Sequence, residues 1–340
     1  MRQITLHGVN DVRIGTVPIP EPPPAGWVQV RVRRVGICGT DLHAYAGKQP
    51  FFRYPRVLGH ELAVTVVALG AGVTAVAVGA DVAVRPYLEC GVCDACRRGR
   101  TNCCERLQVL GVHIDGGMQG IINLPADHLH PAHGASLEGL ALVEMLSIGF
   151  HAVRRGAPTP EQRVVVVGLG PIGLGVCLAA RTRGCAVVAV DPSPTRRAFA
   201  LAHGLAAAAV DPGADVRAAV TAACGGAADV VFDATGHPGA MEASFGLPGN
   251  GGTLVFVGLV QGTLAFDDPE FHRRELTVLA SRNAIAADFD AVIAALPSID
   301  IAAWVNRRCT PTGLADALAT WRDPQSGVIK GMLDMDGEAD

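Results

Sequence analysis

Apolar and polar residues alternate along the first part of the chain in the manner of half-buried β-strands. The stretch 27–35, which reads Trp-Val-Gln-Val-Arg-Val-Arg-Arg-Val, has a period of two, which turns every second side chain to one face. Two further apolar runs follow at 63–70 and 81–86, with glycines between them. Short strands separated by glycine turns predict a small, antiparallel, barrel-like region before residue 150.

The pattern changes near residue 150, where strand-like and helix-like segments begin to alternate. Residues 163–168 form a continuous run rich in valine, which is typical of a parallel strand buried on both faces. Helices are expected at 172–183 and 195–203. Further strands are expected at 186–191, 206–211, 229–235, 251–259 and 276–281. This order predicts an α/β fold with a doubly wound parallel sheet.

Length and charge narrow the class of protein. A chain of 340 residues is long enough for two domains, and its mixed tail, 283–340, could form a short third region or return to the first domain. The net charge of −4 does not favour partners such as nucleic acids or anionic membranes. No apolar run reaches the roughly 20 residues of a membrane span, and the N-terminus lacks the apolar core of a signal peptide. We therefore expect a cytoplasmic protein.

A glycine fingerprint follows the run at 163–168 and opens the first expected helix: Gly168, Leu169, Gly170, Pro171, Ile172 and Gly173. In a dinucleotide-binding turn, the three glycines allow the tight turn, the approach of the pyrophosphate and close helix–strand packing. Asp191 ends the next expected strand, about 20 residues further on, where an acid accepts the ribose hydroxyls. That acid favours NAD over NADP, although Arg196 and Arg197 keep NADP open because a guanidinium can bind a phosphate. The alternative is a glycine turn in an unrelated α/β fold.

Half of the ten cysteines lie between residues 90 and 104. Cys90, Cys93, Cys96 and Cys104 have the spacing of a closed tetrahedral zinc site, which is structural because no position is open for a substrate. Cys103 is adjacent and could replace Cys104. The alternative is a set of unligated buried cysteines. Disulfide frameworks belong to short secreted chains, so this clustering indicates metal binding in a reducing cytosol.

A second group of metal-ligand types is split between two short segments. Cys38 and His43 lie in one segment, and His60 and Glu61 lie in the other. A thiolate, an imidazole and a carboxylate together suit an open zinc site. Glu144 lies inside an apolar run, and a buried acid must be paired, protonated or bound to a metal. Taken singly, these residues have plainer interpretations, namely a structural histidine and a carboxylate at the start of a helix.

Four motifs stand in order along the chain: Gly36-Ile-Cys-Gly-Thr-Asp41, Gly59-His-Glu61, the four cysteines and the glycine fingerprint. Together they resemble the zinc-dependent medium-chain dehydrogenases, the family of alcohol, sorbitol and threonine dehydrogenases. Longer segments lie at 47–61, 100–105, 110–117, 268–272 and 280–284. These segments resemble the bacterial sugar-acid dehydrogenases of the L-galactonate dehydrogenase type. The resemblance covers essentially the whole chain.

The resemblance implies two interleaved domains. Residues 1–147 are expected to form a GroES-like β-barrel catalytic domain, with a structural zinc lobe at about 88–106. A Rossmann domain that binds the nicotinamide cofactor is expected at 148–282, and residues 283–340 are expected to return to the catalytic domain. Family members are commonly homodimers or homotetramers, often joined through the edge of the Rossmann sheet.

The resemblance also implies the ligands of a catalytic zinc. Cys38 and His60 match two ligands, and Glu144 matches the acid that replaces a cysteine as third ligand in the polyol and sugar branch. Glu61 matches a neighbouring acid that binds the zinc or exchanges with water. Asp41 matches the group that orients the His60 imidazole.

Further roles follow from the same resemblance. Thr40 and His43 match a relay that carries the substrate proton through the cofactor ribose to solvent. Four residues match the sheet edge and loop that meet the nicotinamide: Gly258, Ser281, Arg282 and Asn283.

The implied reaction is the oxidation of a secondary alcohol to a ketone, with two zinc ions per chain and NAD as hydride acceptor. The implied substrate is a small polyhydroxy acid such as L-galactonate. Candidate cations for its carboxylate are Arg53, His113, Arg282 and Lys330. Alternatives are another polyol or amino-sugar alcohol dehydrogenase, a zinc-free quinone reductase and a non-catalytic NAD-binding protein. The metal ligands and relay residues argue against the last two.

Overall fold

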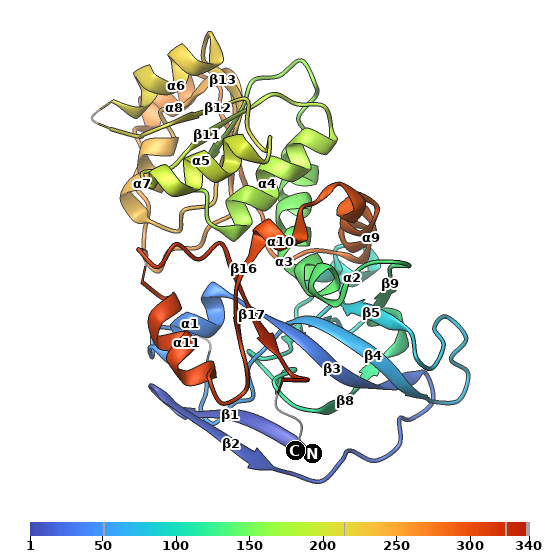
Figure 1. Cartoon of the computed structure of the whole chain (residues 1–340). Helices are drawn as coiled ribbons and strands as arrows, with labels where there is room; N and C mark the ends of the chain where they lie inside the picture. The colour runs from blue at the N-terminus through green and yellow to red at the C-terminus, as the bar shows by residue number, and fades with distance from the viewer. Residues whose placement is uncertain (50–51, 214, 324, 338–340) are drawn as a thin grey trace. The chain divides into compact units, whose positions relative to one another are not determined.

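The computed structural model describes residues 1–49, 52–213, 215–323 and 325–337 (Figure 1). The chain divides into two compact units. Unit 1 comprises Met1–Glu144 and Ile285–Asp340, and unit 2 comprises Met145–Ala284. The sequence analysis placed the corresponding boundaries at 148 and 282. Two residues of the motif-bearing segment 47–61, Pro50 and Phe51, lie outside the described residues.

Unit 1 is built on a mainly antiparallel seven-stranded sheet. Neighbouring strands follow the order β16-β17-β3-β4-β5-β9, and β8 also pairs with β3. The strands are β3 (Trp27–Ile37), β4 (Glu61–Leu69), β5 (Asp81–Val84), β8 (Ile121–Pro125), β9 (Leu129–Pro131), β16 (Val305–Cys309) and β17 (Lys330–Asp334). Two small sheets pair β1 (Arg2–Gly8) with β2 (Asp11–Thr16), and β6 (Tyr87–Leu88) with β7 (Gln108–Val109). The helices are α1 (Gly39–Tyr45), α2 (Asp94–Arg97), α9 (Ala286–Ala295), α10 (Ile301–Trp304) and α11 (Leu314–Trp321).

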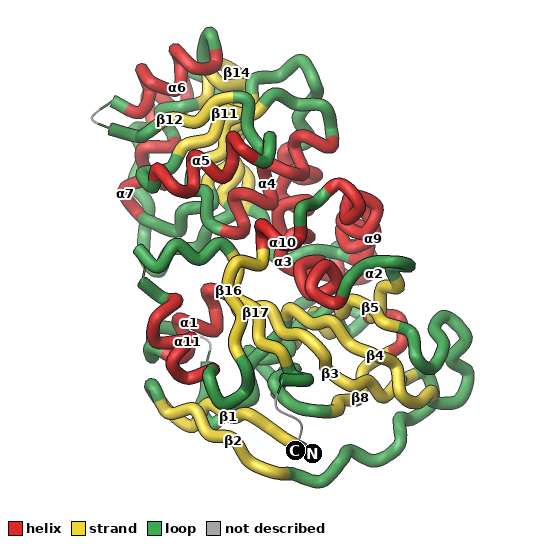
Figure 2. Tube along the Cα trace, viewed as in Figure 1, coloured by secondary structure: helices red, strands yellow, loops and turns green. Residues whose placement is uncertain are grey.

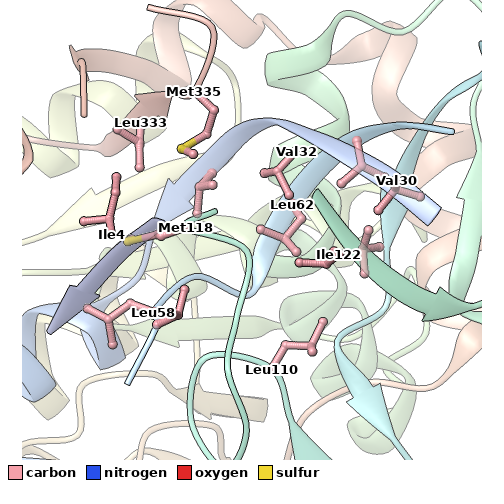
Figure 3. Packing of buried hydrophobic residues seen from close by; sticks show 14 of the residues in the cluster. Ile4, Val30, Val32, Leu58, Leu62, Leu110, Met118, Ile122, Leu333 and Met335 are labelled. Carbon is pink, nitrogen blue, oxygen red and sulfur yellow. The ribbon is translucent and has the colours of Figure 1, made fainter. Parts of the chain in front are cut away.

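The alternation of residues 27–35 creates the core of unit 1. Val28, Val30 and Val32 are buried in β3, while the residues between them are more exposed. Figure 3 shows Val30 and Val32 among buried side chains from distant segments, including Ile4 and Leu333. Both ends of the chain therefore contribute to one hydrophobic core, which stabilises the fold by removing apolar surface from water.

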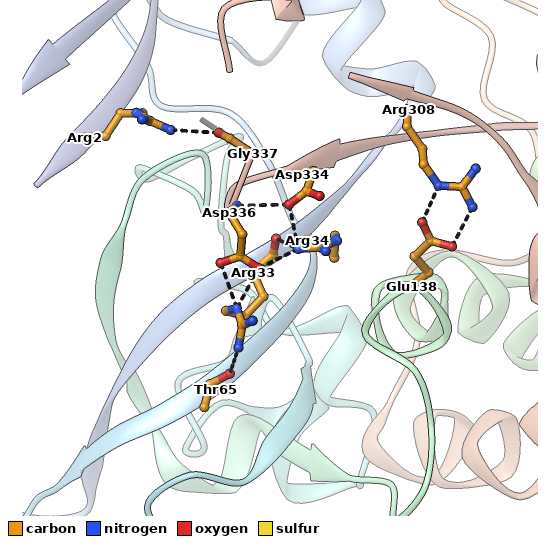
Figure 4. A network of polar contacts seen from close by, with 9 residues as sticks. All are labelled: Arg2, Arg33, Arg34, Thr65, Glu138, Arg308, Asp334, Asp336 and Gly337. Carbon is orange, nitrogen blue, oxygen red and sulfur yellow. Dashed lines mark hydrogen bonds and ion pairs between the residues drawn. The ribbon is translucent and has the colours of Figure 1, made fainter. Parts of the chain in front are cut away.

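The C-terminal tail belongs to the sheet of unit 1. β17 pairs antiparallel with β3, and β16 pairs parallel with β17. Beyond β17, the Asp336 carboxylate accepts hydrogen bonds from Arg33 and Arg34 at 2.7–2.9 Å, and Arg33 also donates to Thr65 (Figure 4). These charged contacts fix the end of the tail on β3.

Unit 2 contains a six-stranded parallel sheet with the order β12-β11-β10-β13-β14-β15. Its strands are β10 (Val164–Val167), β11 (Val187–Val190), β12 (Ala208–Val210), β13 (Ala228–Asp233), β14 (Pro248–Phe256) and β15 (Thr277–Ala280). Its helices are α4 (Pro171–Thr182), α5 (Pro194–Ala202), α6 (Val216–Cys224), α7 (Pro238–Ser244) and α8 (Asp268–Arg273), and α3 (Leu137–Gly156) belongs to both units. Figure 2 shows helices around this sheet. All four valines of β10 are buried, as expected for a strand covered on both faces.

The predicted α/β fold class is confirmed, and each predicted strand and helix is present with ends shifted by at most about three residues. The sequence analysis did not identify the β1–β2 hairpin or the short strands β8, β9, β16 and β17. Most of β2 is exposed, so its sequence carries no alternation of buried and exposed positions. Among the described residues, no helix combines the length and apolar character needed to cross a membrane.

Candidate active site

Strand pairing at one end of the unit 1 sheet brings together three of the four predicted ligands of the catalytic zinc, whereas Glu144 is not a member of this group. Cys38 follows β3 directly and is the N-cap of α1. β3 and β4 are in register up to Gly36 and Glu61, so His60 and Glu61 lie beside Cys38. The candidate ligand atoms of Cys38, His60 and Glu61 all lie within 4.8 Å of one another. His60 and Glu61 are buried, whereas Cys38 remains partly accessible.

Asp41 is the buried partner of this group on α1. Its Oδ2 accepts a hydrogen bond of 2.9 Å from the backbone N–H of Cys38, and its Oδ1 lies 3.9 Å from Nδ1 of His60. Burial raises the pKa of Asp41 although the His60 imidazole lowers it. Neither Oδ1 nor Nδ1 has a hydrogen-bond partner within the described ranges. A histidine that binds a metal through its other ring nitrogen uses such a carboxylate to fix its ring.

Glu61 is paired with a cation that comes from the C-terminal tail. Lys330, the first residue of β17, is 1% exposed, and its Nζ lies 2.5 Å from Oε1 of Glu61. Gly36 makes room for this carboxylate, because a Cβ at Gly36 would lie 2.0 Å from Oε2 of Glu61. Burial lowers the pKa of Lys330, but Glu61 and Cys38 outweigh burial and the pKa is raised. Lys330 is thus engaged by Glu61, a role that the sequence analysis did not assign to it.

Glu144 lies in the middle of α3, so the plainer interpretation of a carboxylate at a helix start does not hold. The hydroxyl of Tyr87 donates a hydrogen bond to Oε1 of Glu144, and both side chains are buried. Burial raises the pKa of Glu144 to about 7. Burial and the nearby carboxylate raise the pKa of Tyr87 well above its ordinary value, so the phenol keeps its proton. Sequence reasoning missed Tyr87, because nothing in its local pattern links it to Glu144.

Acidic groups gather around Cys38 and His60. The carboxyls of Asp41, Glu61 and Glu144 are buried there, and Lys330 pairs with Glu61. Burial lowers the pKa of His60, but Cys38 and Asp41 outweigh burial and raise it well above its ordinary value. A thiolate, an imidazole and a carboxylate form a donor set that zinc binds. These residues therefore fit a zinc ion.

Thr40 and His43 lie three residues apart on α1, so they share one face of the helix. Thr40 is half-buried and His43 is exposed. The pair therefore leads from the partly buried start of α1 toward solvent. The proton-relay role of these two residues stays a prediction.

The ligand atoms of the four predicted cysteines also lie within 4.8 Å of one another. Cys93 and Cys96 flank the start of α2, and their sulfurs are 3.5 Å apart. The sulfur of Cys104 accepts hydrogen bonds from the backbone N–H groups of Cys90 and Arg106, each at 3.3 Å. Backbone N–H groups lower the pKa of Cys90 to about 6. Cys104, and not the exposed Cys103, is the fourth member of the group, which fits a closed zinc site.

The glycine fingerprint of unit 2 forms a tight strand-to-helix turn. Gly168 follows β10 with a φ of 88°, which only glycine adopts readily, and Gly170 is the N-cap of α4. A Cβ at Gly173 would lie 1.7 Å from the carbonyl oxygen of Gly168, so helix and turn pack without space for a side chain. The free N–H groups at the start of this 12-residue helix suit a phosphate.

A cavity of about 470 Å³ lies beside this turn within unit 2. Its walls include Gly168, Gly170, Asp191, Arg196, Thr235 and His237. The two carboxylate oxygens of Asp191 accept hydrogen bonds from the backbone N–H groups of Leu169, at 2.6 Å, and Ser193, at 2.8 Å. The guanidinium of Arg196 lies 3.9 Å from the same carboxylate. One cavity therefore brings together the predicted ribose acceptor and the cation that could bind an extra phosphate.

The remaining predicted cofactor contacts lie beyond the carboxyl ends of β14 and β15. Gly258 packs so closely that a Cβ there would lie 2.4 Å from the nitrogen of Gly236. Ser281 Oγ and Asn283 Nδ2 are buried and have no hydrogen-bond partner in the part of the chain that the structure describes. Arg282 is exposed. Ligands of parallel sheets bind at this edge, so these polar atoms are available to one.

Of the other predicted contacts for a substrate carboxylate, Arg53 is exposed. The ring of His113 accepts a hydrogen bond of 3.0 Å from the backbone N–H of Val109, which closes the turn after β7. That contact gives His113 a structural role.

Comparisons with known proteins agree with this arrangement. The family model of the alcohol dehydrogenase GroES-like domain matches residues 24–134, and that of the zinc-binding dehydrogenases matches residues 171–298. The chain is 48% identical to L-galactonate-5-dehydrogenase of Escherichia coli strain K12 over 262 residues, which cover 76% of this chain and 77% of that one. It is 34% identical to 2-dehydro-3-deoxy-L-galactonate 5-dehydrogenase of Pseudoalteromonas atlantica, over 93% of this chain and 94% of that one.

A solved structure gives the same fold. The alcohol dehydrogenase RspB of Escherichia coli CFT073, complexed with NADH, superposes with a TM-score of 0.91 at 29% identity. The match covers 98% of this chain and 99% of that chain.

Proposed function

This chain belongs to the family of zinc-binding alcohol dehydrogenases, and we propose that it oxidises a secondary alcohol of a polyhydroxy substrate to a ketone with NAD. The observation that carries the proposal is the group of Cys38, His60 and Glu61, whose thiol, imidazole and carboxyl ligand atoms lie within 4.8 Å of one another. A protein that only binds NAD has no need of such a group. The same argument disfavours a zinc-free quinone reductase.

Each residue at or near the group has a separate proposed role. Cys38 and His60 would hold the catalytic zinc together with Glu61 or Glu144, and zinc, when bound, supplies a Lewis acid that makes an alcohol more acidic. Lys330 holds Glu61 by an ion pair, and Tyr87 holds Glu144 by a hydrogen bond. Thr40 and His43 would receive the proton of the substrate hydroxyl and pass it to solvent.

The cofactor is assigned to the cavity of unit 2. The start of α4 would bind the pyrophosphate, and Asp191 would accept the ribose hydroxyls. The buried carboxylate disfavours the additional phosphate of NADP, which supports NAD, while Arg196 keeps NADP as the weaker alternative. The four clustered cysteines would hold a second, structural zinc, so each chain would bind two zinc ions.

A sugar acid is the preferred substrate, with L-galactonate as the first candidate. Two relatives with high coverage are named for oxidation of galactonate-type compounds at carbon 5, and the identity to one of them is 48%. Another polyol or amino-sugar alcohol is the alternative, since residues that contact the substrate differ readily within one family.

A homodimer or homotetramer is the proposed assembly, joined through β15. This strand is at the edge of the unit 2 sheet, and Thr277, Val278 and Ala280 are exposed on it. An exposed, partly apolar edge strand is a surface on which a second copy can pair.

Formation of NADH, followed by absorbance, tests the function. Zinc-loaded protein is mixed with NAD or NADP and with L-galactonate, other sugar acids, polyols and simple alcohols. We expect the largest kcat/KM with a sugar acid and NAD. If NADH forms only with another polyol, the proposed reaction stands and the proposed substrate is wrong.

Cys38→Ser and His60→Ala are expected to lower turnover by at least about 1,000-fold while NADH still binds, because the cavity proposed for the cofactor is lined by unit 2 alone. Fluorescence titration with NADH measures that binding. Turnover that persists in both variants would contradict the assignment of the active site.

A further inference from the structure

A polar cluster, largely buried, contacts the backbone carbonyl of Tyr87. It consists of Arg85, Glu89 and His128, and we call it the brace. Arg85 is 3% exposed, and its guanidinium donates a hydrogen bond of 2.6 Å to Oε2 of Glu89. Nε2 of His128 lies 3.2 Å from the same carboxylate oxygen. The mechanism derived above uses none of these three residues.

The brace holds the backbone of Tyr87. The carbonyl oxygen of Tyr87 accepts from Arg85 at 3.3 Å and from Nε2 of His128 at 3.1 Å. The carbonyl can only accept, so Nε2 of His128 donates to it, and Nδ1 of the same ring lies 2.8 Å from Oδ1 of Asp127. The other end of the residue is fixed as well, since the phenol donates to Glu144 and the ring meets Phe289 edge-on with centroids 6.2 Å apart.

The backbone around Tyr87 is held by a short ladder and by two flanking hydrogen bonds, from Leu110 to Pro86 at 3.1 Å and from Arg85 to His128 at 2.8 Å. β6 is two residues long and pairs only with the equally short β7 in the described part of the chain. A two-stranded ladder of this size is marginal by itself. The next residue after Glu89 is Cys90, the first of the four clustered cysteines. Without the brace, the backbone carbonyl of Tyr87 would lose both of its side-chain donors, and the short ladder would be left to hold this part of the backbone.

The hydrogen bonds within the brace depend on the charge of Glu89. Oε2 of Glu89 lies 2.6 Å from the guanidinium of Arg85 and 3.2 Å from Nε2 of His128. A carboxylate in an ion pair with a guanidinium accepts charge-assisted hydrogen bonds, which are shorter and stronger than neutral ones. Replacing Glu89 by an uncharged isostere keeps the shape and removes that strength.

We propose that Arg85, Glu89 and His128 are positioning residues, which fix Tyr87 and thereby set the position of the Glu144 carboxyl at the zinc site. The proposal rests on the proposed function, because it gives Glu144 a place at the catalytic zinc. Groups that orient metal ligands typically change metal affinity or activity by about 10–100-fold when they are removed. The brace would contact Tyr87 and not a zinc ligand itself, so we expect its loss to change kcat and the zinc-release rate by only about tenfold.

Glu89→Gln tests the proposal in the zinc-loaded full chain. Two quantities are measured: kcat, and the rate at which a chromogenic chelator withdraws the less tightly held zinc. We expect kcat to fall about tenfold with an unchanged KM for NAD, and zinc release to become about tenfold faster. Tyr87→Phe, which removes the phenolic donor, is expected to produce both changes.

The double variant Glu89→Gln/Tyr87→Phe separates positioning from general stability. If Glu89 acts through Tyr87, the double variant resembles Tyr87→Phe alone, because the two effects share one route. Effects that simply multiply, or a lower Tm with unchanged kcat and zinc release, would overturn the proposal. Asp11→Asn, in the exposed Asp11–Arg13 pair of the β1–β2 hairpin, is the control and should change neither quantity.

Two further points keep the test decisive. If Glu89→Gln does not fold, Arg85→Met/Glu89→Met removes both charges with apolar side chains, which buried ion pairs often tolerate. Its zinc release should be faster than that of the unmodified chain, and equal release would overturn the proposal. If the unmodified chain oxidises no alcohol, the proposed function fails, while the zinc-release rates still test the brace.

Discussion

A single buried lysine shows how much of the site depends on contacts between distant residues. Lys330 and Glu61 are separated by 269 positions and are 1% and 0% exposed. Lys330→Met leaves the Glu61 carboxylate buried without its cation. Removal of one partner of a buried ion pair typically costs about 3–5 kcal/mol, and we expect a loss of that size in the free energy of unfolding.

Urea unfolding measures the loss, and Glu61→Gln/Lys330→Met is the matched control. The double variant removes both charges and should recover part of the lost stability. An unfolding free energy of Lys330→Met equal to that of the unmodified chain would mean that the ion pair does not compensate Glu61.

Asp191 carries the prediction about cofactor choice. Both carboxylate oxygens accept backbone N–H groups, one of them from the glycine turn. In Asp191→Asn, the amide nitrogen cannot accept, so one of these bonds is lost together with the negative charge. We expect the Kd for NADH to rise about tenfold, equivalent to about 1.4 kcal/mol, and the Kd for NADPH to rise less.

Fluorescence titration with both reduced cofactors checks this expectation. Asp211→Asn is the control, because it removes the same charge from the next strand end, where Asp211 pairs with Arg197. It should leave the ratio of the Kd for NADH to the Kd for NADPH unchanged. If Asp191→Asn leaves the ratio of these two Kd values unchanged, the prediction that Asp191 accepts the ribose hydroxyls is contradicted.

At the scale of elements, prediction from the sequence succeeds where the pattern is local. β3 and β10 are recognised because alternation or a continuous valine run follows from how each strand is buried. β17 is not recognised, because its first residue is a lysine whose burial depends on Glu61 in β4. The same holds for the site: the ligand types are readable from spacing, whereas Tyr87 at Glu144 is a tertiary contact without a local signal.

The attachment of the C-terminal tail to β3 gives a pH-dependent prediction. Burial raises the pKa of Asp336, but hydrogen bonds from Arg33 and Arg34 outweigh it and lower the pKa below 3.8. The network therefore stabilises the fold above pH 3.8, and this contribution is lost as the pH falls below 3.8 and through the lowered pKa. Asp336→Asn should cost about 1 kcal/mol near pH 7, because these groups are partly exposed.

Thermal unfolding from pH 7 to pH 3 checks this prediction. The difference in Tm between the unmodified chain and Asp336→Asn should shrink as the carboxyl of the unmodified chain is protonated. Glu21→Gln removes an exposed carboxylate of the segment before β3 and should show no such pH-dependent difference. If the difference in Tm between Asp336→Asn and the unmodified chain stays constant from pH 7 to pH 3, the charge of Asp336 does not contribute to stability.

At the scale of the whole molecule, the two-unit organisation could be predicted because the type of pattern changes along the chain. Residues before 144 alternate as in an antiparallel sheet, whereas unit 2 alternates strands with helices. The tail was ambiguous from its pattern alone, since membership of the first unit is decided by pairing with β3. The resemblance of four ordered motifs resolved what periodicity left open.

Assembly through β15 is the prediction that belongs to this largest scale. Val278 is 38% exposed on the edge strand, and β14 is the only pairing partner of β15 among the described strands. In a two-fold symmetric pairing of two edges, each residue meets the equivalent region of the other copy. Val278→Lys therefore introduces two positive charges at one interface, where facing like charges are destabilising.

Light scattering coupled to size exclusion measures the outcome. The unmodified chain should have a mass that is a multiple of 35.2 kDa, and Val278→Lys should shift toward 35.2 kDa. Val78→Lys places the same charge on a 61% exposed valine of unit 1 and should leave the mass unchanged. A multimer that persists in Val278→Lys would place the interface elsewhere, and a monomeric unmodified chain would exclude the assembly altogether.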